Sequence, residues 1–296
     1  MKNYQNFYFV GIGGIGMSAL ARYFHAAGKN VLGYDKTETK LTTELQKEGI
    51  SITFEDVVDE KISSLKKEET LVIYTPAIKV LGILDYFNEN GFEVLKRAKV
   101  LGMITEDTNC IAVAGTHGKT TTSSLVAHLC KVANLPFSGF LGGIAENYKS
   151  NFIFNGTEMS VLEADEYDRS FLNLSPDWAI ITSIDADHLD IYGDTETIEQ
   201  GFRDFADLVP ENDQLFVRKG VNIGRPCKTY AVNEEADYYS DNLRIIDGWM
   251  MFDFHAGEQT VEFAWQIPGT HNVENATAAI AVLHNLGADF SAIQEG

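Results

Sequence analysis

The sequence predicts an α/β protein with two domains, and three observations support this prediction. Apolar runs with the character of buried strands alternate with stretches whose apolar residues recur at helical spacing, as in parallel sheets covered by helices. Two of these strand-to-helix steps pass through glycine-rich loops, one near residue 11 and one near residue 115. The chain has 296 residues, which is more than a single domain usually holds.

The first glycine loop lies in residues 6–35. The spacing Gly11-x-Gly13-x-x-Gly16 separates an apolar strand from a helical stretch, and the next strand ends at Asp35. Such glycines let the backbone approach a pyrophosphate, and such an acid accepts a hydrogen bond from a ribose hydroxyl. The pattern suits NAD and other nucleotide diphosphates equally, and for Asp35 a solvated strand end is the alternative. The stretch 71–78 is expected to form a strand that leads into a loop beginning at Thr75. This loop is either an ordinary turn or part of the ligand-binding edge of the sheet.

The second glycine loop lies in residues 111–122, IAVAGTHGKTTT. An apolar strand, a loop ending in Gly-Lys-Thr and a helix make a phosphate-binding arrangement, in which Lys119 adds positive charge and the Thr120 hydroxyl can hold Mg²⁺. Val113 stands where the first glycine of the common G-x-x-x-x-G-K-[ST] pattern belongs. We therefore predict a variant phosphate loop.

Two further apolar strands, 160–162 and 179–184, are each followed by acidic residues. The first run contains Glu163, Asp165, Glu166 and Asp168, and the second contains Asp185, Asp187, His188 and Asp190. The carboxyl ends of parallel strands meet at one sheet edge, where so many carboxylates need a cation or an arginine to offset them. We expect metal or phosphate chemistry there, with solvated acidic loops as the alternative.

The last third of the chain has a different character. Residues 228–267 hold short β-branched and aromatic segments, and Asp247-Gly248 is typical of a hairpin turn, so we expect a small antiparallel sheet. His271, Asn272 and Asn275 open the final long helix, where asparagine can cap the helix or bind a base edge. The glycine-rich segment 137–148 is expected to form loops near the nucleotide.

Composition excludes some classes of function. The formal net charge of -20 argues against a nucleic-acid surface. Cys110, Cys130 and Cys227 lack metal-site spacing and favour free thiols in a reducing compartment. No apolar run reaches transmembrane length and the N-terminus does not have the pattern of a signal peptide, so we expect a cytoplasmic protein with no membrane partner.

These patterns define two expected domains. Residues 1–106 are expected to form a Rossmann-like parallel-sheet domain. Residues 107–296 are expected to form a P-loop-type α/β ATPase domain carrying the small antiparallel sheet.

The motifs GTHGKTTT, EADEYD, DADHLD and GTHNVENATAA, in this order, resemble those of the Mur ligases of peptidoglycan synthesis, and the resemblance covers nearly the whole chain. The N-terminal VGIGGIGMSALARYF is similar to the family member that uses L-alanine. The resemblance implies an ATP- and Mg²⁺-dependent enzyme that joins L-alanine to the carboxylate of UDP-N-acetylmuramate through an acyl phosphate. The family's C-terminal amino-acid-binding domain is expected to be absent, because the chain stops at Gly296.

The resemblance also implies roles for individual residues. It assigns catalysis to Lys119, Glu163 and His188, and metal binding to Thr120, Glu163 and His188. ATP binding is assigned to Gly115, Thr116, His117, Gly118, Lys119, Thr120, Thr121, His271, Asn272 and Asn275. UDP-sugar binding is assigned to Gly11, Gly13, Gly14, Ile15, Gly16, Asp35 and Thr75. Several relatives carry a carbamylated lysine after the DADH motif, but 197–208 contains Arg203 and no lysine, so no carbamate is expected.

Three other functions remain open at this point. A related ligase could attach an intact tripeptide to the same UDP-sugar. A dehydrogenase could use the Gly11–Asp35 unit to bind NAD, although this would leave the second phosphate loop and the acidic clusters without a role. A nucleotide-binding module without turnover is the third. The oligomeric state is not indicated by any of these patterns.

Overall fold

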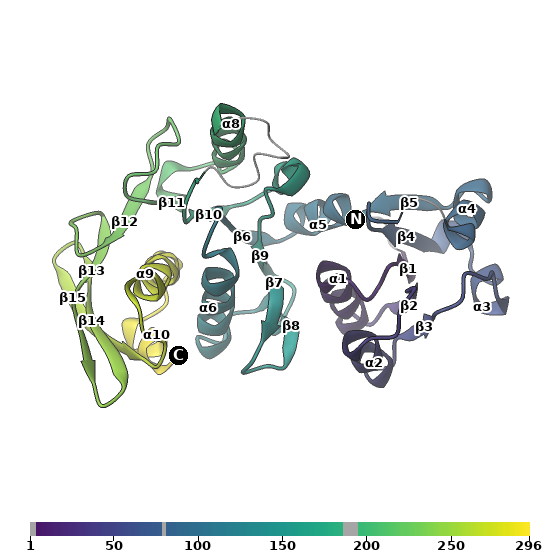
Figure 1. The fold of residues 1–296 in the computed structure, drawn as a ribbon, viewed down its shortest axis with the longest axis horizontal. Coiled ribbons are helices and arrows are strands. Elements are labelled where there is room, and N and C mark those ends of the chain that lie inside the picture. The colour runs from purple at the N-terminus through teal and green to yellow at the C-terminus, as the bar shows by residue number, and fades with distance from the viewer. Residues whose placement is uncertain (1–3, 79–80, 186–194) are drawn as a thin grey trace. The chain divides into compact units, whose positions relative to one another are not determined.

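The computed structural model describes residues 4–78, 81–185 and 195–296, and the chain divides into two compact units (Figure 1). The first unit contains the residues up to Asp107 together with Gly142–Phe154. The second contains Thr108–Leu141 and Asn155–Gly296. The sequence predicted an uninterrupted first domain, so the inclusion of 142–154 in the first unit is a difference that its side-chain contacts explain below.

The first unit is built on a parallel sheet with the strand order β3-β2-β1-β4-β5 in its described residues. This confirms the predicted Rossmann-like sheet. Its strands are β1 (Asn6–Val10), β2 (Asn30–Tyr34), β3 (Ser51–Thr53), β4 (Thr70–Tyr74) and β5 (Glu93–Lys96). Its helices are α1 (Ile15–Ala26), α2 (Lys40–Lys47), α3 (Glu60–Ser63), the 3₁₀ helix η1 (Lys67–Glu69), α4 (Gly82–Glu89) and α5 (Arg97–Glu106).

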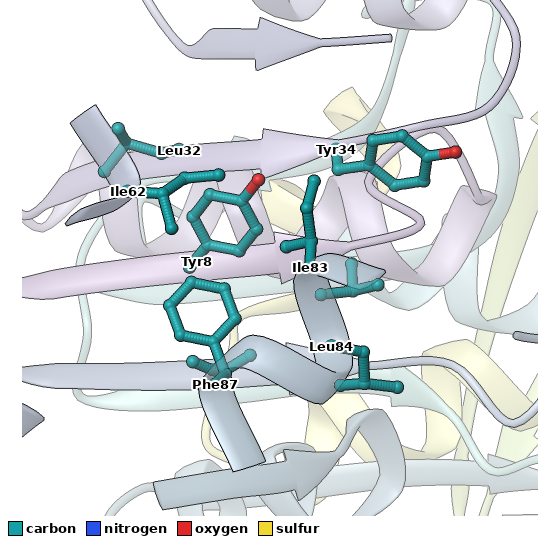
Figure 2. Close-up of a cluster of buried hydrophobic side chains, with 9 residues drawn as sticks. Tyr8, Leu32, Tyr34, Ile62, Ile83, Leu84 and Phe87 are labelled. Atoms are coloured by element: carbon teal, nitrogen blue, oxygen red, sulfur yellow. The ribbon is translucent and has the colours of Figure 1, made fainter. Parts of the chain in front are cut away.

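Both faces of this sheet are covered, with α1 and α2 on one side and α3 and α4 on the other (Figure 1). Phe7 of β1 stacks on Phe24 of α1 with ring centroids 3.7 Å apart. The next residue, Tyr8, faces the opposite way and packs against Phe87 of α4 at 4.8 Å, in the buried cluster shown in Figure 2. Burial on both faces explains why residues 7–10 of β1 are apolar instead of alternating with polar residues.

A buried polar network attaches residues 142–154 to the first unit. Arg22 of α1 donates to the Glu48 carboxylate from Nε at 2.9 Å and from Nη2 at 2.7 Å, and it donates from Nη1 to Asn151 Oδ1 in β8 (Ser150–Phe154). The Asn151 amide in turn donates to Ser18 Oγ at 2.9 Å and to the Ile15 carbonyl. Asn151 is fully buried, and its side-chain amide has hydrogen-bond partners at both its oxygen and its nitrogen, as a buried polar group requires.

Asn151→Ala is expected to lower the free energy of unfolding by about 2 kcal/mol, because Arg22 and the Ile15 carbonyl lose their buried partner. Urea unfolding followed by circular dichroism measures this. Asn147→Ala, at an exposed position of the same hairpin, is the control and should change stability by less than about 0.5 kcal/mol. Equal urea midpoints for the two variants would show that the network does not stabilise the fold.

The second unit is built on a mixed sheet with the strand order β15-β14-β13-β12-β11-β10-β6-β9-β7. Strand β8 follows β7 in this order, but β8 and the end of β7 belong to the residues 142–154 of the first unit. The neighbours from β13 to β9, and the pair β7 and β9, are parallel, whereas β13, β14 and β15 are antiparallel. Its strands other than β8 are β6 (Asn109–Ala114), β7 (Phe137–Ala145), β9 (Met159–Glu163), β10 (Trp178–Ile181), β11 (Leu215–Arg218), β12 (Lys228–Val232), β13 (Tyr238–Ile246), β14 (Trp249–Ala256) and β15 (Gln259–Trp265).

Helices cover both faces of this sheet as well. On one face α6 (Lys119–Val132) packs against α9 (Thr270–Asn285), and α8 (Thr195–Ala206) lies on the other (Figure 1). Shorter helices are η2 (Tyr167–Asn173), η3 (Asn212–Gln214) and α10 (Phe290–Glu295). Across the described parts of the chain, each helix is too short or too polar to cross a membrane.

Three local predictions can be compared with this sheet. The Asp247-Gly248 hairpin is confirmed, with positive φ at both residues as a two-residue turn of this type requires. The segment 137–148 was predicted as loops but contains β7, because pairing with β9 overrides the low strand propensity of its glycines. Strand β12 was predicted as part of the antiparallel sheet, yet it pairs in parallel with both β11 and β13.

Candidate nucleotide-binding site

The loop between β6 and α6 wraps around the N-terminus of the helix. Gly115 and Gly118 have φ angles of 139° and 82°, which favour glycine, and Gly118 is the residue that precedes the first helical residue, Lys119. The backbone N–H groups at this helix end suit an anion. Val113, which stands where the common motif has its first glycine, is fully buried within β6. Glycine is not required at this position, because the backbone is extended between β9 and β10.

The end of β10 holds this loop in place. Thr116 Oγ1 and Ser183 Oγ are 2.8 Å apart, and the His117 N–H donates to Ser183 Oγ at 3.0 Å. The Thr182 hydroxyl donates to the Ala114 carbonyl at 3.2 Å and also to the His117 carbonyl. The sequence reasoning missed Thr182 and Ser183, although two hydroxyl residues directly after a buried strand were a signal that could have found them.

Pairing between β9 and β6 brings the first acidic run to the loop. Glu163 pairs with Val113, and Thr120 Oγ1 donates to Glu163 Oε2 at 2.8 Å. The Lys119 ammonium donates to Glu166 Oε1 at 3.0 Å and to the Gly115 carbonyl. Glu163 and Glu166 of the acidic run therefore form one site with the phosphate loop.

The oxygen atoms of Thr120 and Glu163 fit a magnesium ion. Mg²⁺ prefers oxygen ligands and is usually held by one or two carboxylates together with phosphates and water. Within the described residues, no group of three or more His, Cys, Asp and Glu side chains is arranged to hold a metal alone. The donor set thus suits a metal that arrives with a nucleotide. His188, predicted as a metal ligand, lies outside the described residues.

Burial raises the pKa of Glu163 above its ordinary value, although the Thr120 hydrogen bond and the Lys119 charge partly oppose the shift. A proton therefore competes with Mg²⁺ at a higher pH than it would at an exposed glutamate. We expect the affinity for ADP in the presence of Mg²⁺ to fall as pH decreases from 7 to about 5, measured by calorimetry. Glu163→Gln should bind about tenfold more weakly at pH 7 and lose this pH dependence. Parallel pH profiles for the two proteins would contradict this expectation.

A pocket of about 400 Å³ opens beside the loop, lined by His117, Gly118, Thr121, Thr182, Ser183, Asp185, Arg218, His271, Glu274 and Asn275. A Cβ built on Gly118 would lie 2.7 Å from Asn275 Oδ1, so Asn275 reaches the loop. Asn272, also predicted to bind ATP, does not line the pocket, and its amide donates to the Pro268 carbonyl at 2.8 Å. That bond instead ties the start of α9 to the preceding segment.

The pocket also contains an ion pair that sequence reasoning missed. Arg218 Nε donates to Glu274 Oε1 at 2.8 Å, and this hydrogen bond is the main cause that raises the pKa of Arg218. The two residues come from β11 and α9 and lie far apart in the sequence, so no local pattern could pair them.

The residues predicted to bind the UDP-sugar gather at the carboxyl ends of β1, β2 and β4. The Gly13 N–H donates to Asp35 Oδ2 at 2.7 Å, so Asp35 contacts the glycine loop. A Cβ on Gly11 would lie 2.9 Å from Thr75 Cγ2. Gly14 precedes the first residue of α1, Ile15, which is 38% exposed.

Arg97 is a further residue at this loop that the sequence did not indicate. A Cβ on Gly16 would lie 2.8 Å from Arg97 Nη1, so the guanidinium borders the start of α1. A guanidinium and a helix N-terminus both favour a negatively charged group.

The chain is similar to known proteins over most of its length. Residues 113–283 match the Mur ligase middle domain, and residues 6–108 match the Mur ligase family, catalytic domain. A UDP-N-acetylmuramate--L-alanine ligase of Flavobacterium psychrophilum is 48% identical over 99% of this chain, which spans 65% of that relative's length. A relative of the same description from Parabacteroides distasonis is 49% identical over 93% of the chain, which spans 62% of its length.

The same fold occurs in solved structures. The UDP-N-acetylmuramate-alanine ligase of Thermotoga maritima superposes with a TM-score of 0.83 at 29% identity, covering 98% of this chain and 67% of that one. A UDP-N-acetylmuramate:L-alanyl-gamma-D-glutamyl-meso-diaminopimelate ligase from Neisseria meningitides reaches the same TM-score of 0.83 at 23% identity, over 99% of this chain and 97% of that one, and shows the fold alone. With two family matches that together span most of its residues, the chain belongs to the Mur ligase family.

Proposed function

We propose that this chain binds the nucleotide substrates of an ATP-dependent ligase that joins L-alanine to the carboxylate of UDP-N-acetylmuramate. The single observation that carries the proposal is that Glu163 of β9 accepts a hydrogen bond from Thr120 of the phosphate loop, next to Lys119. The Flavobacterium relative, 48% identical and named for this reaction, supports the choice of substrates.

The residues of the second unit would act on ATP. Backbone N–H groups of the Gly115–Gly118 loop would bind phosphate oxygens, and Lys119 would offset the charge that develops on the transferred phosphoryl group. Thr120 and Glu163 would hold Mg²⁺, which supplies further charge stabilisation. The pocket with His271 and Asn275 would take the nucleoside.

The first unit would hold UDP-N-acetylmuramate, with Gly13, Gly14 and Gly16 beside the diphosphate and Arg97 offsetting its charge. The substrate carboxylate would attack the γ-phosphorus of ATP, with ADP leaving, to form an acyl phosphate. The amine of L-alanine would then attack the acyl carbon and release phosphate, which yields the amide. Free thiols at Cys110, Cys130 and Cys227 support action in the cytoplasm.

The test is phosphate release with ATP, Mg²⁺ and UDP-N-acetylmuramate, comparing L-alanine with the tripeptide L-alanyl-γ-D-glutamyl-meso-diaminopimelate. The assay should use this chain and, where the gene continues past Gly296, the full gene product. We expect release with L-alanine. Release with the tripeptide alone would favour the tripeptide ligase, and tight binding of NADH with no binding of UDP-N-acetylmuramate would refute the proposed role of the first unit.

Phosphate release separates an enzyme from a binding module, because both would bind nucleotides. Binding of ADP and of UDP-N-acetylmuramate by the full gene product, without phosphate release under any of these conditions, would support a binding module without turnover.

A further inference from the structure

We infer that Glu166 makes nucleotide binding in the second unit depend on a divalent cation, because it neutralises Lys119 before a nucleotide arrives. The inference rests on the nucleotide site proposed above. It assigns Glu166 a role in setting the position and the charge balance of the phosphate-loop lysine, and not a direct contact with substrate.

The contacts of Lys119 carry the inference. Its ammonium has three hydrogens and three acceptors, namely the Gly115 carbonyl, the Thr116 carbonyl at 3.4 Å and Glu166 Oε1 at 3.0 Å. The Lys119 and Glu166 side chains are only 14% and 4% exposed. Water screens such a pair poorly, so the carboxylate cancels much of the positive charge that Lys119 would offer to a phosphate.

The backbone around Glu166 is held firmly, so its carboxylate stays beside Lys119. Before it, the Ala164 N–H donates to the Val113 carbonyl at 2.8 Å. After it, the Phe171 N–H donates to the Asp165 carbonyl at 3.0 Å, and the buried Phe171 ring stacks on Phe205 of α8 at 5.0 Å. A nucleotide would more easily exchange the long Thr116 contact of Lys119 than displace Glu166.

The carboxylates around the loop would therefore oppose a metal-free nucleotide. Glu163 lies beside Thr120, and Glu166 balances Lys119. Arg218, in the adjoining pocket, is already bonded to Glu274. A divalent cation at Thr120 and Glu163 would supply the missing positive charge. Glu166→Gln keeps the shape and an acceptor for Lys119 but removes the negative charge, which leaves the lysine charge available to phosphate.

The experiment is calorimetric titration of this chain with ADP, once in excess Mg²⁺ and once in EDTA. We expect the wild-type chain to bind ADP about 100-fold more weakly in EDTA. Glu166→Gln should bind ADP in EDTA about tenfold more tightly than wild type and change its affinity in Mg²⁺ by less than about threefold. A purely structural role for Glu166 would weaken binding in both conditions instead of changing their ratio.

Asp165→Asn is the matched control. It removes one negative charge from the same segment, but the Asp165 carboxylate accepts a hydrogen bond from the Tyr167 N–H at 3.0 Å. Its effect on ADP binding in EDTA should stay below about threefold. An Asp165→Asn effect as large as that of Glu166→Gln would overturn the specific assignment to Glu166.

The outcomes separate this inference from the proposed function. If wild type binds no ADP even with Mg²⁺, the proposed nucleotide site fails and the inference fails with it. If wild type requires Mg²⁺ but Glu166→Gln binds ADP in EDTA no more tightly, only the inference fails. Should Glu166→Gln not fold, the wild-type protein still tests the inference, because equal ADP affinity in EDTA and in Mg²⁺ would overturn it.

Discussion

Gly115→Ala is expected to abolish nucleotide binding and to lower the free energy of unfolding by about 3 kcal/mol. A Cβ at this position would lie 2.0 Å from Thr182 Oγ1 and 2.9 Å from the Ser183 backbone nitrogen, and the φ of 139° is strained for alanine. To avoid this clash, the loop would have to move away from Thr182 and Ser183, which hold it in place. ADP titration and urea unfolding measure the two effects.

Gly220→Ala is the matched control for backbone strain. Gly220 also has a positive φ, 91°, but a Cβ there would meet nothing within 4 Å. It should cost about 1 kcal/mol of stability and leave ADP binding unchanged. If Gly115→Ala behaved like Gly220→Ala in both measurements, close packing between the loop and β10 would not be required for the site.

Lys119→Met has the second large expected effect. It removes the cation of the phosphate loop and leaves Glu166 buried without its ion-pair partner. We expect ADP affinity in Mg²⁺ to fall about 100-fold and stability to fall by about 3 kcal/mol. In the full gene product, phosphate release should be lost, because charge on the transferred phosphoryl group would no longer be offset.

The double variant Lys119→Met, Glu166→Gln separates these two losses. Stability should recover, since the unpaired buried carboxylate is gone, whereas ADP binding should stay weak because the lysine charge is still missing. Lys131→Met, in the last turn of the same helix, controls for the loss of a lysine and should bind ADP normally. Recovery of ADP binding in the double variant would show that Lys119 does not bind phosphate.

Much of the fold was accessible from local sequence patterns. The apolar run of β1 and the glycines after it predict a strand, a turn and a helix, because all these residues are contiguous and their preferences agree. The segment 137–148 was the clearest failure. Its glycines suggest loops, and the pairing of β7 with its neighbours β9 and β8 makes most of it a strand.

Two features of the site can be predicted from local sequence, namely two glycine loops suited to phosphates and the acidic residues that follow the strand ending at Glu163. Each of these features is encoded in a short continuous stretch. The tertiary structure alone decided that Glu166 pairs with Lys119, that β10 braces the loop, and that Asn151 joins 142–154 to the first unit. The partners in the first and last of these contacts lie 47 and 129 residues apart, so only the folded sheet order could bring them within hydrogen-bonding distance.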